Sequence, residues 1–313
     1  MRPIIMILGP TAGGKTSLAI ELAKKLPNGG ECVCADSMQI YKRMDIGTAK
    51  PTMEERKAAP HHLFDLIEPS EQGFTVDSWL SQANTKIEEI RSRRKWPIVV
   101  GGTNLYVQSL LFGMFDAPSA NPQRRAELES CTNDQLREIL QKIDPEATMR
   151  IHINDRRRTI RAIEVFEMTG KPISEQQTQW NGQSSREDAR IIGLDWQVGL
   201  INRRINKRVK MMMDDGLLGE VISLQEEIGM QASEALGYKQ LLAHLRGECD
   251  LEYAVERIKI LTRRYAKAQR TWLRRFKVLP KTHFIEIGEK QSQVIATEAL
   301  THALGSQISE ISG

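Results

Sequence analysis

Eight consecutive residues near the amino terminus, GPTAGGKT at positions 9–16, match the phosphate-binding pattern GxxxxGK[ST]. The apolar run Ile4–Leu8 precedes them, and Thr16–Leu26 follows with helical spacing of its apolar residues. In this setting the glycines let backbone N–H groups converge on one anion, Lys15 adds a positive charge and Thr16 can ligate Mg²⁺. We therefore predict diphosphate or triphosphate binding by Gly9, Pro10, Thr11, Ala12, Gly13, Gly14, Lys15 and Thr16.

The carboxylate of Asp36 comes directly after a second strand-like run, Cys32–Ala35. In open α/β sheets, ligands bind in the crevice at the carboxyl ends of the strands, which is where such a residue lies. Asp and Ser are also frequent turn and capping residues after strands. The position of Asp36 alone therefore leaves a chemical role and a turn role both open.

Strand-like and helical patterns alternate over most of the chain. Further strand-like runs are Leu63–Ile67, Ile98–Val100, Ile191–Leu194 and Phe284–Ile287, and a helical pattern covers Val76–Arg94. This alternation predicts an α/β fold, in which a parallel sheet similar to that of P-loop NTPases is covered by helices on both faces.

A turn-rich segment, Pro118–Pro122, interrupts this alternation, and a polar helical stretch follows from Gln123 to about Arg150. We predict an inserted, mainly helical lobe at residues 119–190. The core would then be formed by residues 1–118 and 191–313.

The charge of the chain is nearly balanced, with 44 basic and 40 acidic residues and a formal net charge of +4. The basic residues are gathered locally, because nine Lys or Arg residues lie between Arg257 and Lys277 and four arginines lie in the range Arg156–Arg161. Such clusters indicate either nucleic-acid contacts or solvated helix faces.

The four cysteines, Cys32, Cys34, Cys131 and Cys249, form no CxxC pair and no cluster at metal-ligand spacing. This pattern argues against a zinc site and a disulfide framework and favours a reducing cytoplasm. No stretch reaches the roughly 18 uninterrupted apolar residues of a membrane-spanning helix. We therefore expect a cytoplasmic protein with no membrane anchor and no zinc.

Five sequence blocks resemble the signature of one enzyme family. They are DSMQIYKRMDIGTAKP at 36–51, PHHL at 60–63, VGGTNLY at 100–106, ALGYKQ at 235–240 and the segment from Arg264 to Trp272. In this order, and with the phosphate loop, they resemble the tRNA dimethylallyltransferases in their short bacterial form. Departures occur at Gly13, where the family usually has serine, at NDRRR (154–158), where glutamine commonly precedes the arginine, and at Ala268, where a basic residue is common.

The resemblance implies a reaction, a cofactor and catalytic residues. A dimethylallyl group would move from dimethylallyl diphosphate to the exocyclic N6 amine of the adenosine 3′ of the anticodon in tRNA, with release of diphosphate. Mg²⁺ at Thr16, Lys15 and Arg208 would stabilise the leaving diphosphate. Asp36 would accept or orient the amine proton, and Thr103 would bound the pocket that holds the base.

Recognition of tRNA would require the target adenosine to turn out of its stack, and the inserted lobe at residues 119–190 would contact the tRNA. The resemblance and the basic clusters predict that the tRNA-binding residues are Asp36, Ser37, Met38, Gln39, Thr103, Arg157, Arg158, Arg161 and Arg270. The expected partners are a tRNA anticodon stem-loop and dimethylallyl diphosphate, and we expect the enzyme to act as a monomer.

Other protein classes use some of the same parts. A small-molecule kinase would hold ATP in the loop with Arg156–Arg161 as a lid, although Ile98–Val100 ends in Gly-Gly-Thr without an Asp for magnesium. An adenylate isopentenyltransferase acting on free nucleotides would need neither the lobe nor two basic surfaces. A nucleotide-gated RNA-binding switch would leave the family blocks without a purpose.

Two further patterns predict packing rather than chemistry. His61 and His62 are neighbours on an extended segment and point to opposite sides, so we predict structural roles for both. Helical spacing predicts one buried helix face formed by Ile258, Leu261, Tyr265, Ala268, Trp272 and Phe276. Trp272 would then be a core residue rather than a platform for a stacked base.

Overall fold

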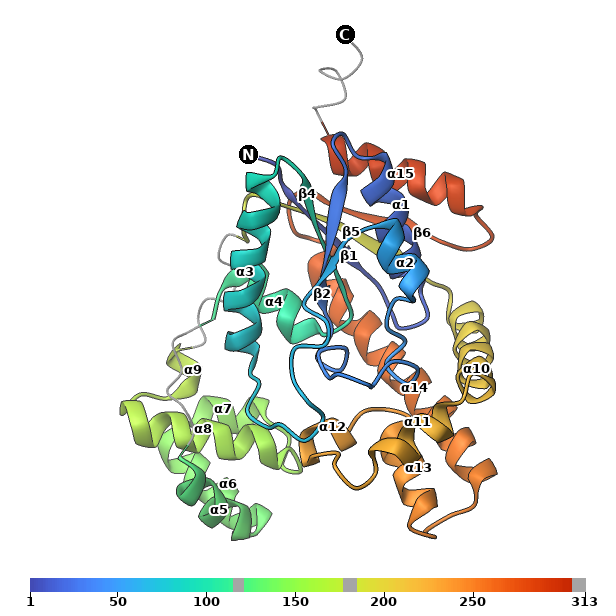
Figure 1. Ribbon diagram of the computed structural model, residues 1–313. Helices are drawn as coiled ribbons and strands as arrows, with labels where there is room; N and C mark the ends of the chain where they lie inside the picture. The colour runs from blue at the N-terminus through green and yellow to red at the C-terminus, as the bar shows by residue number, and fades with distance from the viewer. Residues whose placement is uncertain (115–120, 177–184, 306–313) are drawn as a thin grey trace. The chain divides into compact units, whose positions relative to one another are not determined.

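Six parallel strands form the central sheet in the order β3-β2-β4-β1-β5-β6 (Figure 1). The computed structural model describes residues 1–114, 121–176 and 185–305. Its strands are β1 (Ile4–Leu8), β2 (Gly30–Ala35), β3 (His61–His62), β4 (Trp96–Gly101), β5 (Ala189–Asp195) and β6 (Thr282–Glu286). Every residue of β1 and β2 is buried, as is usual for parallel strands covered on both faces. The predicted α/β fold is confirmed.

Helices cover both faces of this sheet. The connection from β1 to β2 through α1 (Lys15–Lys25) and the connection from β2 toward β4 through α3 (Val76–Ser92) run in opposite directions along the sheet. Because such crossovers are right-handed, α1 and α3 lie on opposite faces. Helix α15 (Ser292–Leu304) packs beside α1 and against β5 and β6 (Figure 1). The neighbouring carboxyl ends of β2, β4 and β1 therefore open onto one crevice.

The remaining helices of this first unit, residues 1–111 and 186–313, share its core. They are α2 (Met53–Ala58), α4 (Asn104–Phe112), α10 (Val198–Asp214), α11 (Leu217–Leu224), α12 (Met230–Ser233), α13 (Tyr238–Leu245) and α14 (Leu251–Leu273). Ile205, Leu217, Tyr238 and Ile258 belong to the same buried apolar cluster as Ile5 of the sheet. This continuous core holds α10 to α14 in place relative to the strands.

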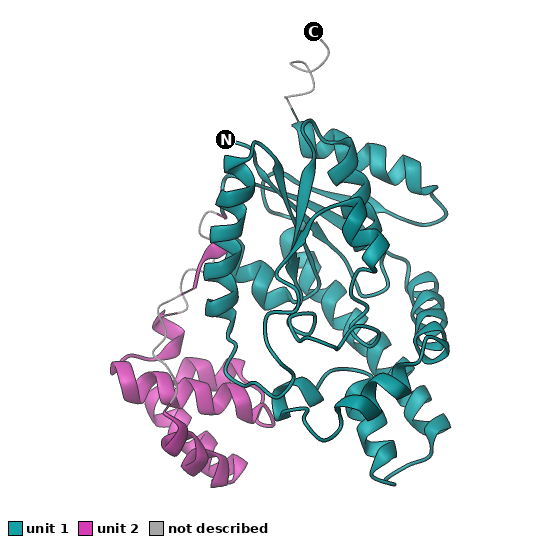
Figure 2. Cartoon of the chain, in the orientation of Figure 1, with its two compact units in different colours: residues 1–111, 186–313 teal, residues 112–185 magenta. Residues whose placement is uncertain are grey.

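Residues 112–185 form a second compact unit, drawn in magenta in Figure 2. It contains α5 (Pro122–Ser130), α6 (Asn133–Ile143), α7 (Pro145–Arg150), α8 (Arg156–Thr169) and α9 (Ile173–Gln176). Its own apolar core includes Leu128, Leu136, Leu140, Ile160 and Ile163. The insertion predicted from the sequence was 119–190, and most of the Pro118–Pro122 turn lies outside the described residues.

Local capping delimits the short helices of the second unit. Thr132 begins α6 in a capping box with Gln135. Asp144, which is buried, ends α6 and begins α7, and its carboxylate also accepts from the N–H and the hydroxyl of Ser174 at 3.0 and 2.7 Å. One residue therefore joins three helices.

The predicted strand Leu63–Ile67 was wrong. The strand at this place is His61–His62, because Leu63 and Asp65 adopt left-handed φ angles of 64° and 53° that end the extended chain. Ile67 makes only an isolated bridge to Tyr41.

No helix within the described ranges is both long and apolar enough to cross a membrane.

The buried face of α14 is rotated relative to the predicted stripe. Its buried residues are Ala254, Ile258, Ala266, Gln269 and Leu273. Tyr265 is 40% exposed, Ala268 is exposed, and Trp272 is half-buried with Arg275 over its ring. The prediction is confirmed for Ile258 and Phe276, which are buried. It was wrong for the middle of the stripe because a polar residue, Gln269, occupies the buried face, so apolar periodicity followed a neighbouring stripe.

Candidate active site

The phosphate loop runs from the end of β1 to the first turn of α1, as its pattern predicts. Ala12 and Gly14 adopt left-handed φ angles of 59° and 85°, and the N–H of Gly13 donates to the carbonyl of Pro10 at 3.1 Å. A Cβ atom on Gly13 would lie 2.7 Å from that carbonyl oxygen and 3.3 Å from Nε1 of Trp196. A serine at this position would therefore require the loop to shift.

The side chains of Lys15, Arg204 and Trp196 donate hydrogen bonds to carbonyl groups of the loop. The Nζ atom of Lys15 donates to two of them, at 3.0 Å each. Arg204 on α10 donates to the carbonyl of Ala12 at 2.9 Å, and Trp196 donates to that of Gly13 at 3.1 Å. The guanidinium of Arg204 also stacks over the Trp196 ring. These bonds order the loop and engage carbonyl oxygens that would otherwise repel an anion.

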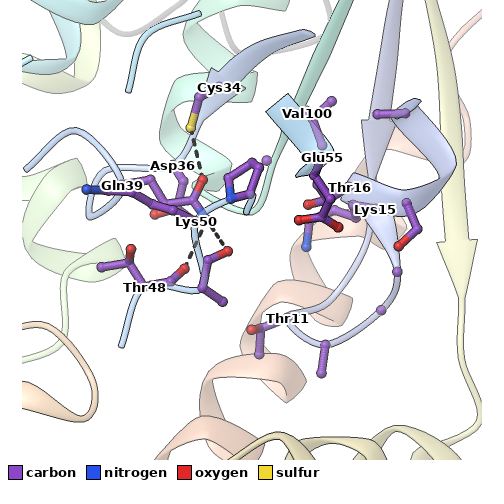
Figure 3. Close-up of a pocket in the computed structure, with 18 of the residues that line it drawn as sticks. Thr11, Lys15, Thr16, Cys34, Asp36, Gln39, Thr48, Lys50, Glu55 and Val100 are labelled. Carbon is purple, nitrogen blue, oxygen red and sulfur yellow. Dashed lines mark hydrogen bonds between the residues drawn. The ribbon is translucent and has the colours of Figure 1, made fainter. Parts of the chain in front are cut away.

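Lys15, Arg208 and Asp36 are among the charged side chains that line a cavity of about 560 Å³ beside the loop. Lys15 and Asp36 lie on different sides of it in Figure 3. Burial lowers the pKa of Lys15 to about 8, with Asp36 opposing and Arg208 reinforcing the shift. Burial also lowers the pKa of Arg208. Neither cation has a carboxylate within ion-pair distance among the described residues, so the cavity favours an anionic ligand.

Asp36 combines a turn role with an available carboxylate oxygen. Its Oδ1 atom accepts from the N–H of Met38 at 2.9 Å and closes the turn after β2. Its Oδ2 atom has no hydrogen-bond partner in the described part of the chain. One oxygen therefore orients the carboxylate, and the other is free to meet a ligand.

The segment after β4 supports that turn. The N–H of Thr103 donates to the carbonyl of Ala35 at 3.2 Å, and its Oγ1 atom accepts from the N–H of Ser37 at 2.9 Å. Thr103 is not among the residues that line the cavity beside the loop. The structure thus places Thr103 next to Asp36 as a backbone support.

A second cavity, of about 320 Å³, shares Asp36 and Arg208 with the first. It is largely apolar, and its lining includes Met38, Ile205, Val209, Met212, Leu217 and Leu236. A charged cavity and an apolar cavity therefore meet at one carboxylate and one guanidinium. This arrangement can hold a ligand, or two ligands, with an anionic part and an apolar part.

The chain after Asp36 forms an internally bonded loop. The Nε2 atom of Gln39 donates to the carbonyls of Thr48 and Ala49 at 2.9 and 3.2 Å, and its Oε1 atom accepts from Sγ of Cys34 at 3.3 Å (Figure 3). The amide of Gln39, predicted to contact tRNA, is thus engaged inside the protein in this structure.

Glu220 on α11 anchors the same loop from the other side. Its carboxylate accepts from the N–H groups of Asp45, Ile46 and Gly47 at 2.9, 2.8 and 3.0 Å, and from the hydroxyl of Tyr238. A Cβ atom on Gly47 would lie 2.4 Å from the Tyr238 ring, so glycine is required there. Glu220 lies in none of the sequence blocks, and no local pattern identifies it.

Other residues lining the first cavity were not predicted as site residues. Lys50 is buried and pairs with Asp45 and Asp65 at 2.8 and 2.5 Å. Glu55 closes the capping box of α2, and its T-x-x-E pattern could have located it. Gln269, in the last family block, also lines the cavity.

The two histidines have different surroundings. His62 Nε2 lies 2.7 Å from Glu31, a buried carboxylate. Burial acts to raise the pKa of Glu31, but hydrogen bonds from Arg93, His62 and Lys95 outweigh it and lower that pKa to about 2. His61 lines the first cavity, and its buried Nε2 atom has no hydrogen-bond partner among the described residues. A packing role thus describes His62 better than His61.

The predicted tRNA-binding arginines lie on two different units. Arg270 is on α14 of the first unit, whereas the other three are on α8 of the second. Arg157 and Arg158 are exposed, with Arg158 at 3.4 Å from Asp155, and Arg161 lies 3.6 Å from Glu164. Exposed arginines of this kind can contact phosphates.

The fold and the site define a class: a P-loop-type α/β protein whose anion-binding loop shares a cavity with a strand-end carboxylate. Comparisons with known proteins give the family. The family model described as IPP transferase matches residues 39–276, and that described as isopentenyl transferase matches residues 2–65. The first of these covers more than half of the chain.

Two curated relatives illustrate the similarity. The tRNA dimethylallyltransferase of Shouchella clausii is 48% identical over 282 residues, which cover 87% of this chain and 88% of that protein. The tRNA dimethylallyltransferase of Carboxydothermus hydrogenoformans is 42% identical over 311 residues, with 96% and 97% covered.

Solved structures give the same result. The tRNA isopentenylpyrophosphate transferase of Bacillus halodurans is 36% identical with a TM-score of 0.73, covering 100% of this chain and 99% of that one. A eukaryotic dimethylallyltransferase acting on tRNA is 30% identical with a TM-score of 0.82, covering 100% and 80%. The chain belongs to the tRNA dimethylallyltransferase family, as its sequence blocks predicted. The kinase and free-nucleotide alternatives receive no support from these relatives.

Proposed function

We propose that this protein transfers the dimethylallyl group of dimethylallyl diphosphate to the N6 amine of the adenosine 3′ of the anticodon in tRNA. The relatives named tRNA dimethylallyltransferases support the reaction class. The observation that carries the proposal is the placement of Asp36 and Arg208 where the charged cavity meets the apolar one. A diphosphate fits the first cavity, and a prenyl group or a base fits the second.

In the proposed reaction, the N6 lone pair attacks the first carbon of the donor. A carbon–nitrogen bond forms, the carbon–oxygen bond to diphosphate breaks, and the electron pair leaves with diphosphate. Lys15, Arg208 and the N–H groups of the loop stabilise this developing negative charge. The N6 amine loses one proton, which the Oδ2 atom of Asp36 accepts.

The residues present fit a magnesium ion. Thr16 is in the first turn of α1 and lines the first cavity, and its hydroxyl has no hydrogen-bond partner among the described residues. A hydroxyl oxygen next to a diphosphate-binding loop suits Mg²⁺, which prefers hard oxygen ligands. When bound there, Mg²⁺ would supply further neutralisation of the diphosphate charge.

For the acceptor, we propose that tRNA binds through its anticodon stem-loop. Exposed Arg157 and Arg158, together with the half-buried Arg270, would hold phosphates, while the target base enters beside Asp36 and Met38. Because tRNA is the substrate, we also propose that the reaction takes place in the cytoplasm.

Labelled dimethylallyl diphosphate tests this function when it is incubated with unmodified tRNA, with AMP, or with no acceptor. We expect label in tRNA only, and loss of that labelling by a factor on the order of 10³ in Asp36→Asn, which keeps the turn but cannot accept the proton. The matched control is Glu54→Gln, which removes one exposed carboxylate from α2. Label in AMP but not in tRNA, or full activity of Asp36→Asn, would contradict the proposal.

A further inference from the structure

Gln269 is a buried polar residue on α14, between the phosphate loop and the segment that supports Asp36. It is 2% exposed, and both ends of its amide are engaged. Its Oε1 atom accepts from the N–H of Thr11 at 2.8 Å, and its Nε2 atom donates to the carbonyl of Gly102 at 2.9 Å. One side chain therefore joins segments 258 and 167 residues distant in sequence.

Each of the two segments that Gln269 bonds belongs to a different part of the active site. Thr11 belongs to the loop that we assign to the leaving diphosphate. Gly102 precedes Thr103, which is bonded to the carbonyl of Ala35 and to the N–H of Ser37 on either side of Asp36. The amide of Gln269 thus links the diphosphate loop to the segment that supports the catalytic carboxylate.

The segments joined by Gln269 are closely packed. A Cβ atom on Gly102 would lie 2.3 Å from Nε2 of Gln269, and one on Gly101 would lie 2.1 Å from the carbonyl oxygen of Ala35. The two glycines thus let the β4 end approach both neighbours more closely than any other residue allows. The Gly102 carbonyl also accepts from the hydroxyl of Tyr265, one turn earlier on α14, at 3.3 Å.

We propose that Gln269 is a positioning residue that sets the alignment between the phosphate loop and Asp36, and hence between the breaking and the forming bond. This rests on the proposed function. In the proposed reaction Gln269 contacts neither substrate, so it affects their alignment rather than their affinity. A displacement of about 1 Å between reacting groups can lower a rate by on the order of 10².

Two substitutions test the role of Gln269. Gln269→Leu removes both hydrogen bonds at similar volume. Gln269→Glu keeps the acceptor for Thr11 but places a second carboxylate oxygen against the Gly102 carbonyl, unless the carboxyl group is protonated and donates there. The matched control is Leu273→Ala, which weakens the packing of α14 one turn later at a buried residue outside the cavity.

The readouts separate alignment from binding and from stability. We expect Gln269→Leu to lower the single-turnover rate with saturating tRNA and dimethylallyl diphosphate by about 100-fold. The Kd values for inorganic pyrophosphate with Mg²⁺ and for unmodified tRNA should change less than threefold. Leu273→Ala should lower the unfolding temperature at least as much while keeping the single-turnover rate within threefold.

Acidification provides a rescue experiment. The single-turnover rate of Gln269→Glu relative to wild type should rise as pH falls from 8 to 5.5, because the protonated side chain restores the bond to Gly102. Lys15, Asp36 and Tyr265 face the same cavity in both proteins, so only the ratio of the two rates is interpreted. Gln269→Leu should show no such rise.

Hydrogen exchange tests the link without any activity. Amides in a peptide covering residues 9–14 should exchange about tenfold faster in Gln269→Leu than in wild type or Leu273→Ala. A normal single-turnover rate, a rate loss that tracks lost binding or lost stability, or unchanged exchange would overturn the role of Gln269. If Gln269→Leu does not fold, Gln269→Glu decides by the same measures. Absence of prenyl transfer by the wild-type protein would instead contradict the proposed function.

Discussion

Two cations of the first unit's cavity, Lys15 and Arg208, differ from the paired cations of the helical second unit in what neutralises them. Lys15 and Arg208 line their cavity with no carboxylate in ion-pair distance among the described residues, and burial lowers the pKa of both. On the second unit, Arg125 instead forms a two-bond pair with Glu164 at 2.8 Å for each bond.

This difference distinguishes cations that bind a ligand from cations that stabilise the folded protein. A half-buried cation without a partner destabilises the folded protein slightly, and an anionic ligand removes that cost when it binds. A paired cation is already neutralised, and its removal exposes its partner instead. The two groups should therefore respond in opposite ways to neutralising substitutions.

Among these cations, the largest effect is expected for Arg208→Met. Loss of one group that stabilises the leaving diphosphate should lower kcat/KM by about 10²–10³. Urea unfolding should show unchanged or slightly increased stability, because an unpaired half-buried charge is removed. The control is Arg203→Met, an exposed arginine on the same helix. A kcat/KM loss below fivefold, or a clear loss of stability, would erase the contrast between the two regions.

The pKa of Lys15 predicts how diphosphate binding depends on pH. With a pKa of about 8, Lys15 loses its charge above pH 8, so the Kd for inorganic pyrophosphate should rise by on the order of 30-fold between pH 7 and pH 9.5. Lys15→Arg should keep its charge, and its Kd should stay nearly constant apart from the titration of pyrophosphate itself. Calorimetric titration measures both. Parallel curves for the two proteins would show that Lys15 does not titrate in this range.

The same pKa has a consequence for folding. The unfolded chain keeps the ordinary lysine value of 10.5, so between pH 8 and 10.5 the unfolded state binds more protons than the folded state at this side chain. The contribution of Lys15 to stability therefore rises with pH across that window and is unfavourable below it. The difference in unfolding free energy between wild type and Lys15→Met should narrow or reverse over this range.

On the second unit, Arg125→Met should affect stability rather than catalysis. It leaves the buried carboxylate of Glu164 with the longer 3.6 Å contact to Arg161, which should cost about 2 kcal/mol. Arg124→Met is the matched control, because its partners Glu127 and Glu167 are partly exposed and its loss should cost less than about 1 kcal/mol. Urea unfolding decides, and equal costs would mean that burial of the partner is unimportant.

The smallest effect is expected for Arg158→Ala. This side chain is 73% exposed and has one 3.4 Å contact with Asp155, so its loss should leave stability unchanged. If it holds a phosphate, the Kd for tRNA should rise about threefold and the salt dependence of binding should fall by about one unit of slope. Arg150→Ala on α7 serves as a control for general charge loss. An unchanged salt slope would remove Arg158 from the tRNA-binding surface.

The phosphate loop and Asp36 could be located from sequence because their signals are local. Gly9–Thr16 carries fixed spacing between a strand and a helix, and Asp36 follows a buried strand. The roles of Glu220 and Gln269 could not be found this way, because the backbone groups that they bind lie more than 160 residues away in the chain. A buried polar residue also disrupts the apolar periodicity that would reveal a helix face, as Gln269 does on α14.

The most direct test of the central claim follows one oxygen atom. Dimethylallyl diphosphate labelled with ¹⁸O at the oxygen that joins carbon to phosphorus is incubated with the protein and unmodified tRNA, and both products are analysed by mass spectrometry. Stabilisation of a departing diphosphate by Lys15 and Arg208 predicts that all of the label is in diphosphate and none is on the prenyl group. Label that stays with the prenyl group would contradict this claim. Transfer of phosphate from ATP to an acceptor, with tRNA left unmodified, would contradict it as well.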